Sequence, residues 1–201
     1  MIKRTSREYV LKILDKNQNN WKILDIGCNR DAVEYSQTVA DIQNLSNFYK
    51  DKNKDFVLVQ NKDLPFKDNQ FDFVYASHVI EHVDDVSYFI KELQRISKQG
   101  YIELPTMLED NIILSENSIK DHKWFFQFDD VNNVLLAERK RQLIEPFITH
   151  GVLFGSLRKN FRSSLVLELL WENEINFEFK DFTVPAKKPY FFYIIKKYFS
   201  Y

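Results

Sequence analysis

The sequence lacks the cysteines that a disulfide-bonded fold requires and the net charge that attracts nucleic acid or anionic membranes. Its 201 residues include a single cysteine, Cys28, so no internal disulfide framework can form. The formal net charge is only -1, which provides no general attraction for nucleic acid or for an anionic membrane surface. Glycine is also scarce, with four residues, and we expect each to occupy a position where the backbone requires it.

Long hydrophobic runs are missing as well. No stretch reaches the roughly 18 apolar residues of a membrane span, and the apolar run near the carboxyl end, residues 189–201, is interrupted by lysines. The first ten residues, "MIKRTSREYV", lack the apolar core of a secretory signal. We therefore expect no membrane span and a cytoplasmic location. A chain of this length with 44% hydrophobic residues suits one domain, residues 1–201.

Short apolar runs alternate with amphipathic segments along most of the chain. Apolar spacing predicts helices at residues 7–14 and 86–96, the second capped by the acids at 84 and 85. The predicted strands are residues 21–27, 38–42, 55–60, 71–77 and 100–105. Such alternation predicts an α/β fold with a Rossmann-like, doubly wound, mostly parallel sheet. Residues 172–179 alternate with period two, and we expect them to pair with residues 189–198 as an antiparallel hairpin that closes the sheet.

Several polar residues follow the predicted strands, where open parallel sheets bind their ligands. Asp25 and Gly27 end the first strand, and Gly27 would permit a tight turn against a ligand. Asp41 ends the second strand, where a carboxylate can accept hydrogen bonds from both hydroxyls of a ribose. Asp63 lies beyond the third strand, in a position to accept from an adenine amine. These positions predict a nucleoside-binding edge.

Two blocks of sequence resemble a known family. "ILDIGC" and "DLPFKDNQFDFVYASHVIEHVDDVSYFIKELQRISKQGYIELP" are similar to class I S-adenosylmethionine-dependent methyltransferases of the type 11-like branch, with close similarity over residues 20–106. The segments "HKWFFQFDD" and "WENEINFEF" more loosely resemble members associated with sugar and polysaccharide biosynthesis. The resemblance implies that S-adenosylmethionine is the cofactor, bound through Asp41 at the ribose, Asp63 with Leu64 at the adenine, and Ser77 with His78 near the methionine.

The sequence also departs from this family. Where further glycines are usual, it has "GCNRDA", which brings side chains into the cofactor turn. Asp41 follows Gly27 by fourteen positions, against about 20 in a dinucleotide fold, so the first crossover helix must be short or replaced by a loop. These departures leave open a catalytically inactive relative that keeps the fold as a binding or scaffold protein. Fold analogy also leaves room for a nucleotide-binding enzyme of another chemistry.

The letters H-x-x-E-H at residues 78–82 have two interpretations. In a helix they would place His78 and His82 on one face with Glu81 between them, as in an inverted zinc protease. However, residues 71–77 are predicted to form a strand that leads directly into His78, so this face should not form, and no third ligand is evident. A divalent ion at Glu81 and His82, as in some methyltransferases of this fold, stays a minor alternative. We expect no metal, and expect these side chains to pack and to cap the start of the next helix.

In methyl transfer, the main task of the side chains is to position the donor and the acceptor in line. When the acceptor is a hydroxyl, a side chain must also remove its proton. The base should titrate near neutrality. His122 is the first candidate, because the segment after the fifth strand usually builds the acceptor side of this fold, and His150 is the second. The predicted function is O-methylation of a small-molecule or sugar/glycan acceptor.

Overall fold

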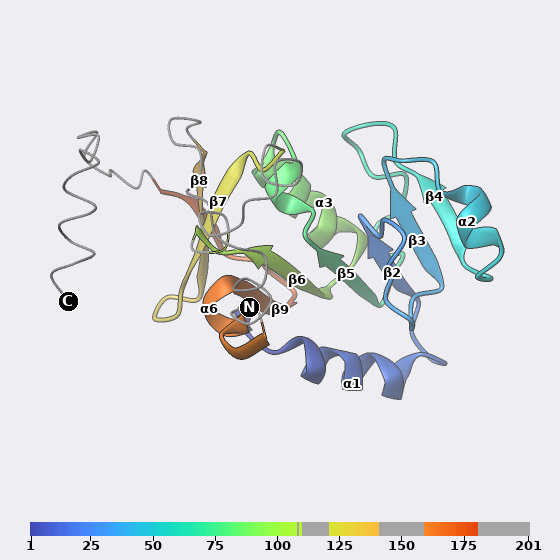
Figure 1. Ribbon diagram of the computed structural model, residues 1–201, viewed down its shortest axis with the longest axis horizontal. Coiled ribbons are helices and arrows are strands. Elements are labelled where there is room, and N and C mark those ends of the chain that lie inside the picture. Colours follow the sequence, from blue (N-terminus) through green and yellow to red (C-terminus); the bar gives the residue numbers. More distant parts are fainter. Residues whose placement is uncertain (108, 110–120, 141–158, 181–201) are drawn as a thin grey trace, which may run out of the picture.

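The computed structural model describes residues 1–107, 109, 121–140 and 159–180, and its larger part is a seven-stranded sheet (Figure 1). The strands lie in the order β1-β9-β6-β5-β2-β3-β4. Their bounds are β1 Ile2–Arg4, β2 Ile23–Ile26, β3 Thr38–Asp41, β4 Asp55–Leu58, β5 Phe73–Ser77, β6 Gln99–Pro105 and β9 Val166–Glu172. All five strands predicted between residues 21 and 105 are therefore present.

The pairing of these strands confirms the predicted fold class. β2 pairs in parallel with both β3 and β5, and β4 and β6 extend the parallel part on the two sides. The chain thus winds outward from β2 in both directions, and the strand order reverses between β2 and β5. β9 joins β6 in antiparallel register, and β1 joins β9 in the same way. The sheet is accordingly mixed and mostly parallel, with its ligand-binding edge expected at the reversal point.

Helices cover both faces of this sheet (Figure 1). α1, Arg7–Asn17, begins at the cap Ser6 and buries Val10 and Leu14. α3, Val86–Ile96, has the bounds predicted from its sequence, and the Asp85 carboxylate accepts the Tyr88 backbone N–H as its cap. Because side chains alternate along a strand, the two helices contact different residues of the same strands. The face under α1 includes Ile23, Phe73 and Tyr101, and the face under α3 includes Leu24, Val74 and Ile102.

Short helices complete this part of the chain: α2 Ser46–Lys50, η1 Ile80–His82 and α6 Arg162–Leu165. No helix lies between β2 and β3, so a loop replaces the first crossover helix, as the short spacing from Gly27 to Asp41 predicted. Across the described parts of the chain, every helix is too short or too polar to cross a membrane.

A second sheet of three strands lies beside the end of β6, in the order β10-β8-β7 (Figure 1). The strands are β7 Trp124–Asp129, β8 Val134–Arg139 and β10 Phe177–Phe179. β10 pairs in parallel with β8, so the prediction that residues 172–179 close the main sheet was wrong for this segment. The physical reason is aromatic packing, since the rings of Phe177 and Phe179 pack together and Phe179 contacts Trp124. The predicted partner, residues 189–198, lies outside the described residues.

Candidate functional site

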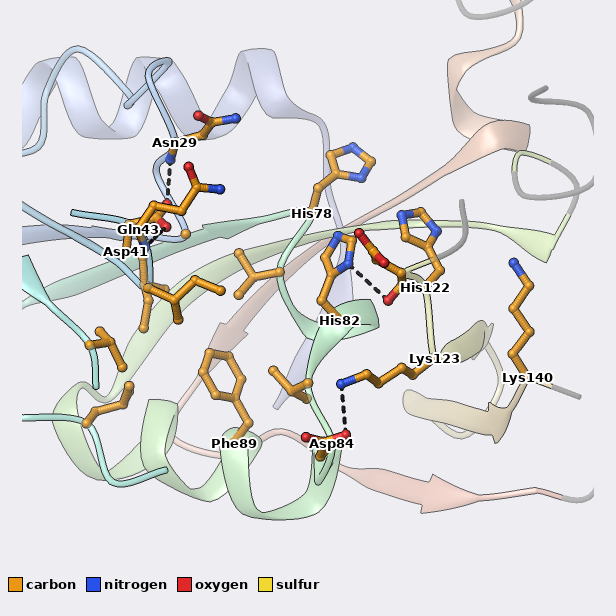
Figure 2. A pocket seen from close by; sticks show the side chains of 18 of the residues that line it. Asn29, Asp41, Gln43, His78, His82, Asp84, Phe89, His122, Lys123 and Lys140 are labelled. Carbon is orange, nitrogen blue, oxygen red and sulfur yellow. Dashed lines mark hydrogen bonds and ion pairs between the residues drawn. The ribbon is translucent and has the colours of Figure 1, made fainter. Parts of the chain in front are cut away.

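A pocket opens at the carboxyl ends of β2, β3 and β5, and the strand order reverses between β2 and β5 (Figure 2). One end of its lining comes from the turn after β2 and from the end of β3. The other end comes from η1, from residues 121–123 before β7, and from the end of β8. Apolar side chains, among them Val59, Leu64 and Phe89, form the wall between the two ends. The pocket thus has a polar end on the sheet and a second polar end that contains two histidines.

Gly27 shapes the turn at the first end. Its φ is 70°, in the left-handed region, and a Cβ built on it would lie 2.2 Å from Val79 Cγ2. Asn29 also has positive φ, at 42°, a conformation that asparagine tolerates better than most residues. The chain therefore makes the tight turn with one glycine and one asparagine, where the family that its sequence resembles usually has further glycines.

Asp41 lies beside this turn, as predicted, and lines the pocket. The Asn29 backbone N–H donates to Asp41 Oδ2 at 2.8 Å, and the Gln43 backbone N–H donates to Oδ1 at 2.9 Å (Figure 2). Each carboxylate oxygen can accept more than one hydrogen bond, so both retain capacity for a ligand hydroxyl. The two backbone donors hold the carboxylate in one orientation, which suits recognition of a diol.

Asp25 has a different place from the one predicted. It is only 3% exposed and does not line the pocket, and its Oδ2 accepts the Val33 backbone N–H at 2.6 Å. Its role is therefore to hold the loop that replaces the crossover helix. Burial raises the pKa of Asp25 to about 7, against the opposing effects of the Val33 N–H and the Lys54 and Arg7 cations.

This pKa predicts a pH-dependent stability. The unfolded chain loses the Asp25 proton near the ordinary pKa of 3.8, whereas the folded carboxyl keeps it until about pH 7. Asp25 therefore lowers the free energy of unfolding progressively as the pH rises between these values. Asp25→Asn removes this titration, so its stability relative to the parent should rise by on the order of 2–3 kcal/mol from pH 5 to pH 8. Urea unfolding at both pH values measures the change, and a constant difference would contradict the assignment.

Asp63 and Leu64 have different environments, and only Leu64 lines the pocket. Leu64 lines the pocket, and its backbone N–H donates to Glu92 Oε2 at 2.8 Å. Asp63 is exposed, is not part of the lining, and accepts a hydrogen bond from the Tyr88 hydroxyl. Leu64 therefore contributes apolar surface to the pocket, whereas Asp63 could contact a ligand there only if its carboxylate turned away from Tyr88.

His78 stands at the end of β5, directly after the half-buried Ser77, and it has a left-handed φ of 54°. Its Nδ1 lies 3.2 Å from Glu81 Oε1 and its Nε2 lies 3.3 Å from Glu103 Oε1. Burial by itself would lower the pKa of His78, but the hydrogen bonds to Glu103 and Glu81 outweigh it and raise the pKa to about 9. His78 is therefore a cation at neutral pH whose ring nitrogens both face carboxylates. This arrangement differs from the helical face of an inverted zinc protease.

Glu81 and His82 form η1 and do not cap α3, so the prediction of a capping role was wrong. Asp85 performs that role, because its backbone is extended at the position where the helix begins. The His82 ring instead packs edge-to-face against His122, with ring centroids 4.7 Å apart (Figure 2). The backbone N–H of Lys123 donates to Glu81 O at 2.7 Å, which ties the segment of His122 to η1. His150 lies outside the described residues.

One candidate ligand atom from each of Glu81, His82 and His122 lies within 4.8 Å of the other two. A third ligand for Glu81 and His82 is not evident from the sequence, because His122 is remote from them along the chain. The only indication of this ligand in the sequence was that His122 lies in the segment expected to build the acceptor side.

Part of the chain is similar to known methyltransferases. Residues 17–102 match a family model described as a methyltransferase domain. The ubiquinone biosynthesis O-methyltransferase of Pelagibacter ubique is 27% identical over 110 residues, which cover 48% of this chain and 45% of that protein. An uncharacterized protein of Methanocaldococcus jannaschii is 28% identical over 116 residues, which cover 55% of this chain and 51% of that one. The chain thus spans about half the length of the curated relatives it matches.

Solved structures are similar in outline. A structure from Thermotoga maritima, described as an S-adenosylmethionine-dependent methyltransferase and possible histamine N-methyltransferase, is 14% identical and has a TM-score of 0.49. The match covers 82% of this chain and 87% of that chain. The YcgJ protein of Bacillus subtilis is 22% identical with a TM-score of 0.41, covering 50% of this chain and 52% of that chain.

Proposed function

We propose that this chain, in which residues 17–102 match a methyltransferase domain, is a class I S-adenosylmethionine-dependent methyltransferase and transfers a methyl group to an oxygen of its acceptor. The family match confirms the predicted family and its methyl donor. The observation that carries the oxygen acceptor is the polarity of the pocket, which has the Asp41 carboxylate at one end and the His82 and His122 imidazoles at the other. Such a pocket can hold a nucleoside and a hydroxyl acceptor side by side.

The donor occupies the end formed by β2 and β3 in this proposal. Asp41 accepts from the ribose hydroxyls, Leu64 packs against the adenine, and the Gly27 turn leaves room for the backbone to approach the methionine part. His78 lines the pocket beside the methionine part in this proposal, Ser77 precedes it, and Asp63 would reach the adenine only after turning away from Tyr88. The donor lies across the reversal point of the sheet, where parallel α/β folds bind their ligands.

The acceptor occupies the histidine end. Its hydroxyl oxygen attacks the methyl carbon, the bond from carbon to sulfur breaks, and the electron pair stays on sulfur. The hydroxyl proton must leave, and an imidazole is the side chain whose ordinary pKa suits this task near neutral pH. Oxygen is favoured over other acceptor atoms by this imidazole pair and by the curated relative that is named an O-methyltransferase.

The proposed class of acceptor has a broader and a narrower form. A small molecule is the broader proposal, and a sugar or glycan acceptor rests only on the resemblance of residues 122–130 and 171–179 to proteins of polysaccharide biosynthesis. The comparisons add no support for a sugar pathway.

We also propose that the described residues belong to one domain. The largest hydrophobic cluster includes Leu104 and Leu167 of the main sheet together with Phe126 and Leu135 of the second sheet. The two sheets therefore share one core, which suits a single folding unit.

A screen for turnover tests the proposal. The protein is incubated with S-adenosylmethionine and a panel of phenols, nucleotide sugars and glycan fragments, and formation of S-adenosylhomocysteine is measured together with the mass of the product. We expect stoichiometric S-adenosylhomocysteine and O-methyl product with at least one hydroxylated acceptor, and no product with O-methylated controls. Methylation of amines alone would contradict the oxygen assignment. Donor binding without turnover on any acceptor would favour the scaffold alternative, which the side chains of "GCNRDA" suggest.

A further inference from the structure

We infer that Glu81, His82 and His122 form a binding site for a divalent transition-metal cation at the acceptor end of the pocket. Their candidate ligand atoms lie within 4.8 Å of one another, and both histidines line the pocket (Figure 2). This inference replaces the expectation from sequence that the chain holds no metal. It deepens the proposed function, since the cation would act on the acceptor of the methyl transfer, but its first test does not require turnover.

Glu81 provides the strongest reason to expect a cation. Its side chain is completely buried, and its Oε1 faces the His78 imidazole at 3.2 Å. Its Oε2 is also buried and has no hydrogen-bond partner among the residues that the structure describes. A buried carboxylate oxygen without a partner costs free energy because it has lost its hydration. A cation bound at Oε2 would compensate for that loss, with His78 holding the other oxygen.

The ring orientation of His82 also suits a ligand. Its Nδ1 lies 3.2 Å from the backbone carbonyl oxygen of Asp121. A carbonyl oxygen only accepts hydrogen bonds, so this contact requires the proton on Nδ1 and leaves the lone pair on Nε2. Metal-binding histidines usually have this arrangement, in which one ring nitrogen donates to a carbonyl and the other binds the metal.

Backbone and side-chain contacts hold the three residues together. Besides the hydrogen bond from Lys123 N to Glu81 O, the Lys140 backbone N–H donates to Lys123 O at 2.8 Å. The Trp124 indole N–H donates to Val83 O at 2.7 Å, and Lys123 Nζ lies 2.8 Å from the Asp84 carboxylate. The segment that carries His122 is therefore fastened to η1 on both sides of the cluster. The proximity of the three ligands follows from this pairing.

The ligand set indicates which cations fit. Two imidazoles and one carboxylate suit Zn²⁺, Co²⁺, Mn²⁺ or Fe²⁺ better than Mg²⁺ or Ca²⁺, which prefer sites built from oxygen alone. Metal–ligand bonds of about 2.0–2.2 Å would draw the three atoms closer together, which side-chain rotation can supply. Three protein ligands leave positions open to the pocket. An acceptor hydroxyl bound there would have a lowered pKa and release its proton to water, with His122 as a ligand and not the free base.

Cobalt binding tests the site directly. Protein stripped with chelator and titrated with Co²⁺ should bind about one equivalent and develop visible d–d absorption. Glu81→Gln keeps the shape of the buried side chain, and His122→Gln changes a half-buried position, so the second variant guards against a folding defect in the first. Since loss of groups that merely support a ligand typically weakens metal binding about 10–100-fold, each variant should weaken Co²⁺ binding by at least that much.

The matched control is Asp41→Ala, at the donor end of the pocket. It should lose S-adenosylhomocysteine binding and retain the cobalt spectrum, whereas the two ligand variants should do the reverse. The inference is overturned if the parent protein shows no stoichiometric Co²⁺ spectrum, or if that spectrum persists unchanged in both ligand variants. Cobalt binding without S-adenosylhomocysteine binding would support the metal site and refute the proposed function, so the two failures are distinguishable.

Discussion

Replacement of His122 by alanine should lower turnover by about 10²- to 10⁴-fold, the usual cost of removing a group that assists proton removal. The structure places His122 against His82 at the acceptor end of the pocket, away from the Asp41 carboxylate (Figure 2). The loss is expected whether His122 accepts the proton itself or binds a cation that acidifies the hydroxyl. Steady-state kinetics, combined with calorimetric titration of S-adenosylhomocysteine, measures the change.

Donor binding and a second histidine provide the controls. The affinity for S-adenosylhomocysteine should stay within a few-fold of the parent, because His122 contacts the acceptor and not the donor in this proposal. His150→Ala, at the other candidate from the sequence, is the matched variant. A loss of rate in His150→Ala with normal rate in His122→Ala would transfer the role of base to His150. A parallel fall in donor affinity and rate for His122→Ala would show that His122 supports the donor site.

S-adenosylhomocysteine at a concentration of roughly 100 times its dissociation constant should add about 2.7 kcal/mol to the free energy of unfolding. For a chain of this size, that gain corresponds to a rise of about 5–10 °C in the melting temperature. Asp41→Ala should remove most of this shift, because it removes the carboxylate that we propose accepts from both ribose hydroxyls. Gly27→Val should remove it too, because a side chain on this left-handed residue would occupy the space of Val79. Thermal melts, supported by calorimetry, measure both effects.

Asp31→Ala is the matched control, since Asp31 is an exposed acid in the same loop and does not line the pocket. It should keep the full shift, and Asp63→Ala should reduce the shift only in part. NAD, which shares the adenosine but not the methionine, should have little effect. If neither S-adenosylhomocysteine nor S-adenosylmethionine binds to folded protein by calorimetry, the side chains of "GCNRDA" have closed the site, and the scaffold alternative replaces the enzyme.

The sequence by itself determined the elements of the parallel sheet. Residues 86–96 have the apolar spacing of a helix and begin after an acidic cap, and the structure has α3 at these residues. The short distance from Gly27 to Asp41 leaves too few residues for a crossover helix, so the loop between β2 and β3 could also be predicted. Both conclusions depend on interactions between residues near in sequence, which are visible in its periodicity and spacing.

The polar edge at the ends of β2 and β3 could likewise be predicted from sequence, because it follows from strand order. The carboxyl ends of adjacent parallel strands meet at one edge, so a residue directly after a strand has a defined place. Gly27 follows β2, Asp41 ends β3, and both line the pocket. Asp25 does not line the pocket, although it also lies in β2. Strand position alone does not reveal whether a side chain faces the pocket or the loop beneath it, and the Asp25 carboxylate accepts a hydrogen bond from the Val33 N–H.

Only the tertiary structure decided the acceptor end. His78 lies between Glu81 and Glu103, and the latter comes from a neighbouring strand. His122 meets His82 because the backbone of Lys123 pairs with Glu81, an interaction between segments remote in the chain. In the same way, β10 joined β8 and not the main sheet because its phenylalanines pack together and against Trp124. Contacts of this kind depend on which surfaces the folded elements present to one another, and periodicity within a single element carries no information about them.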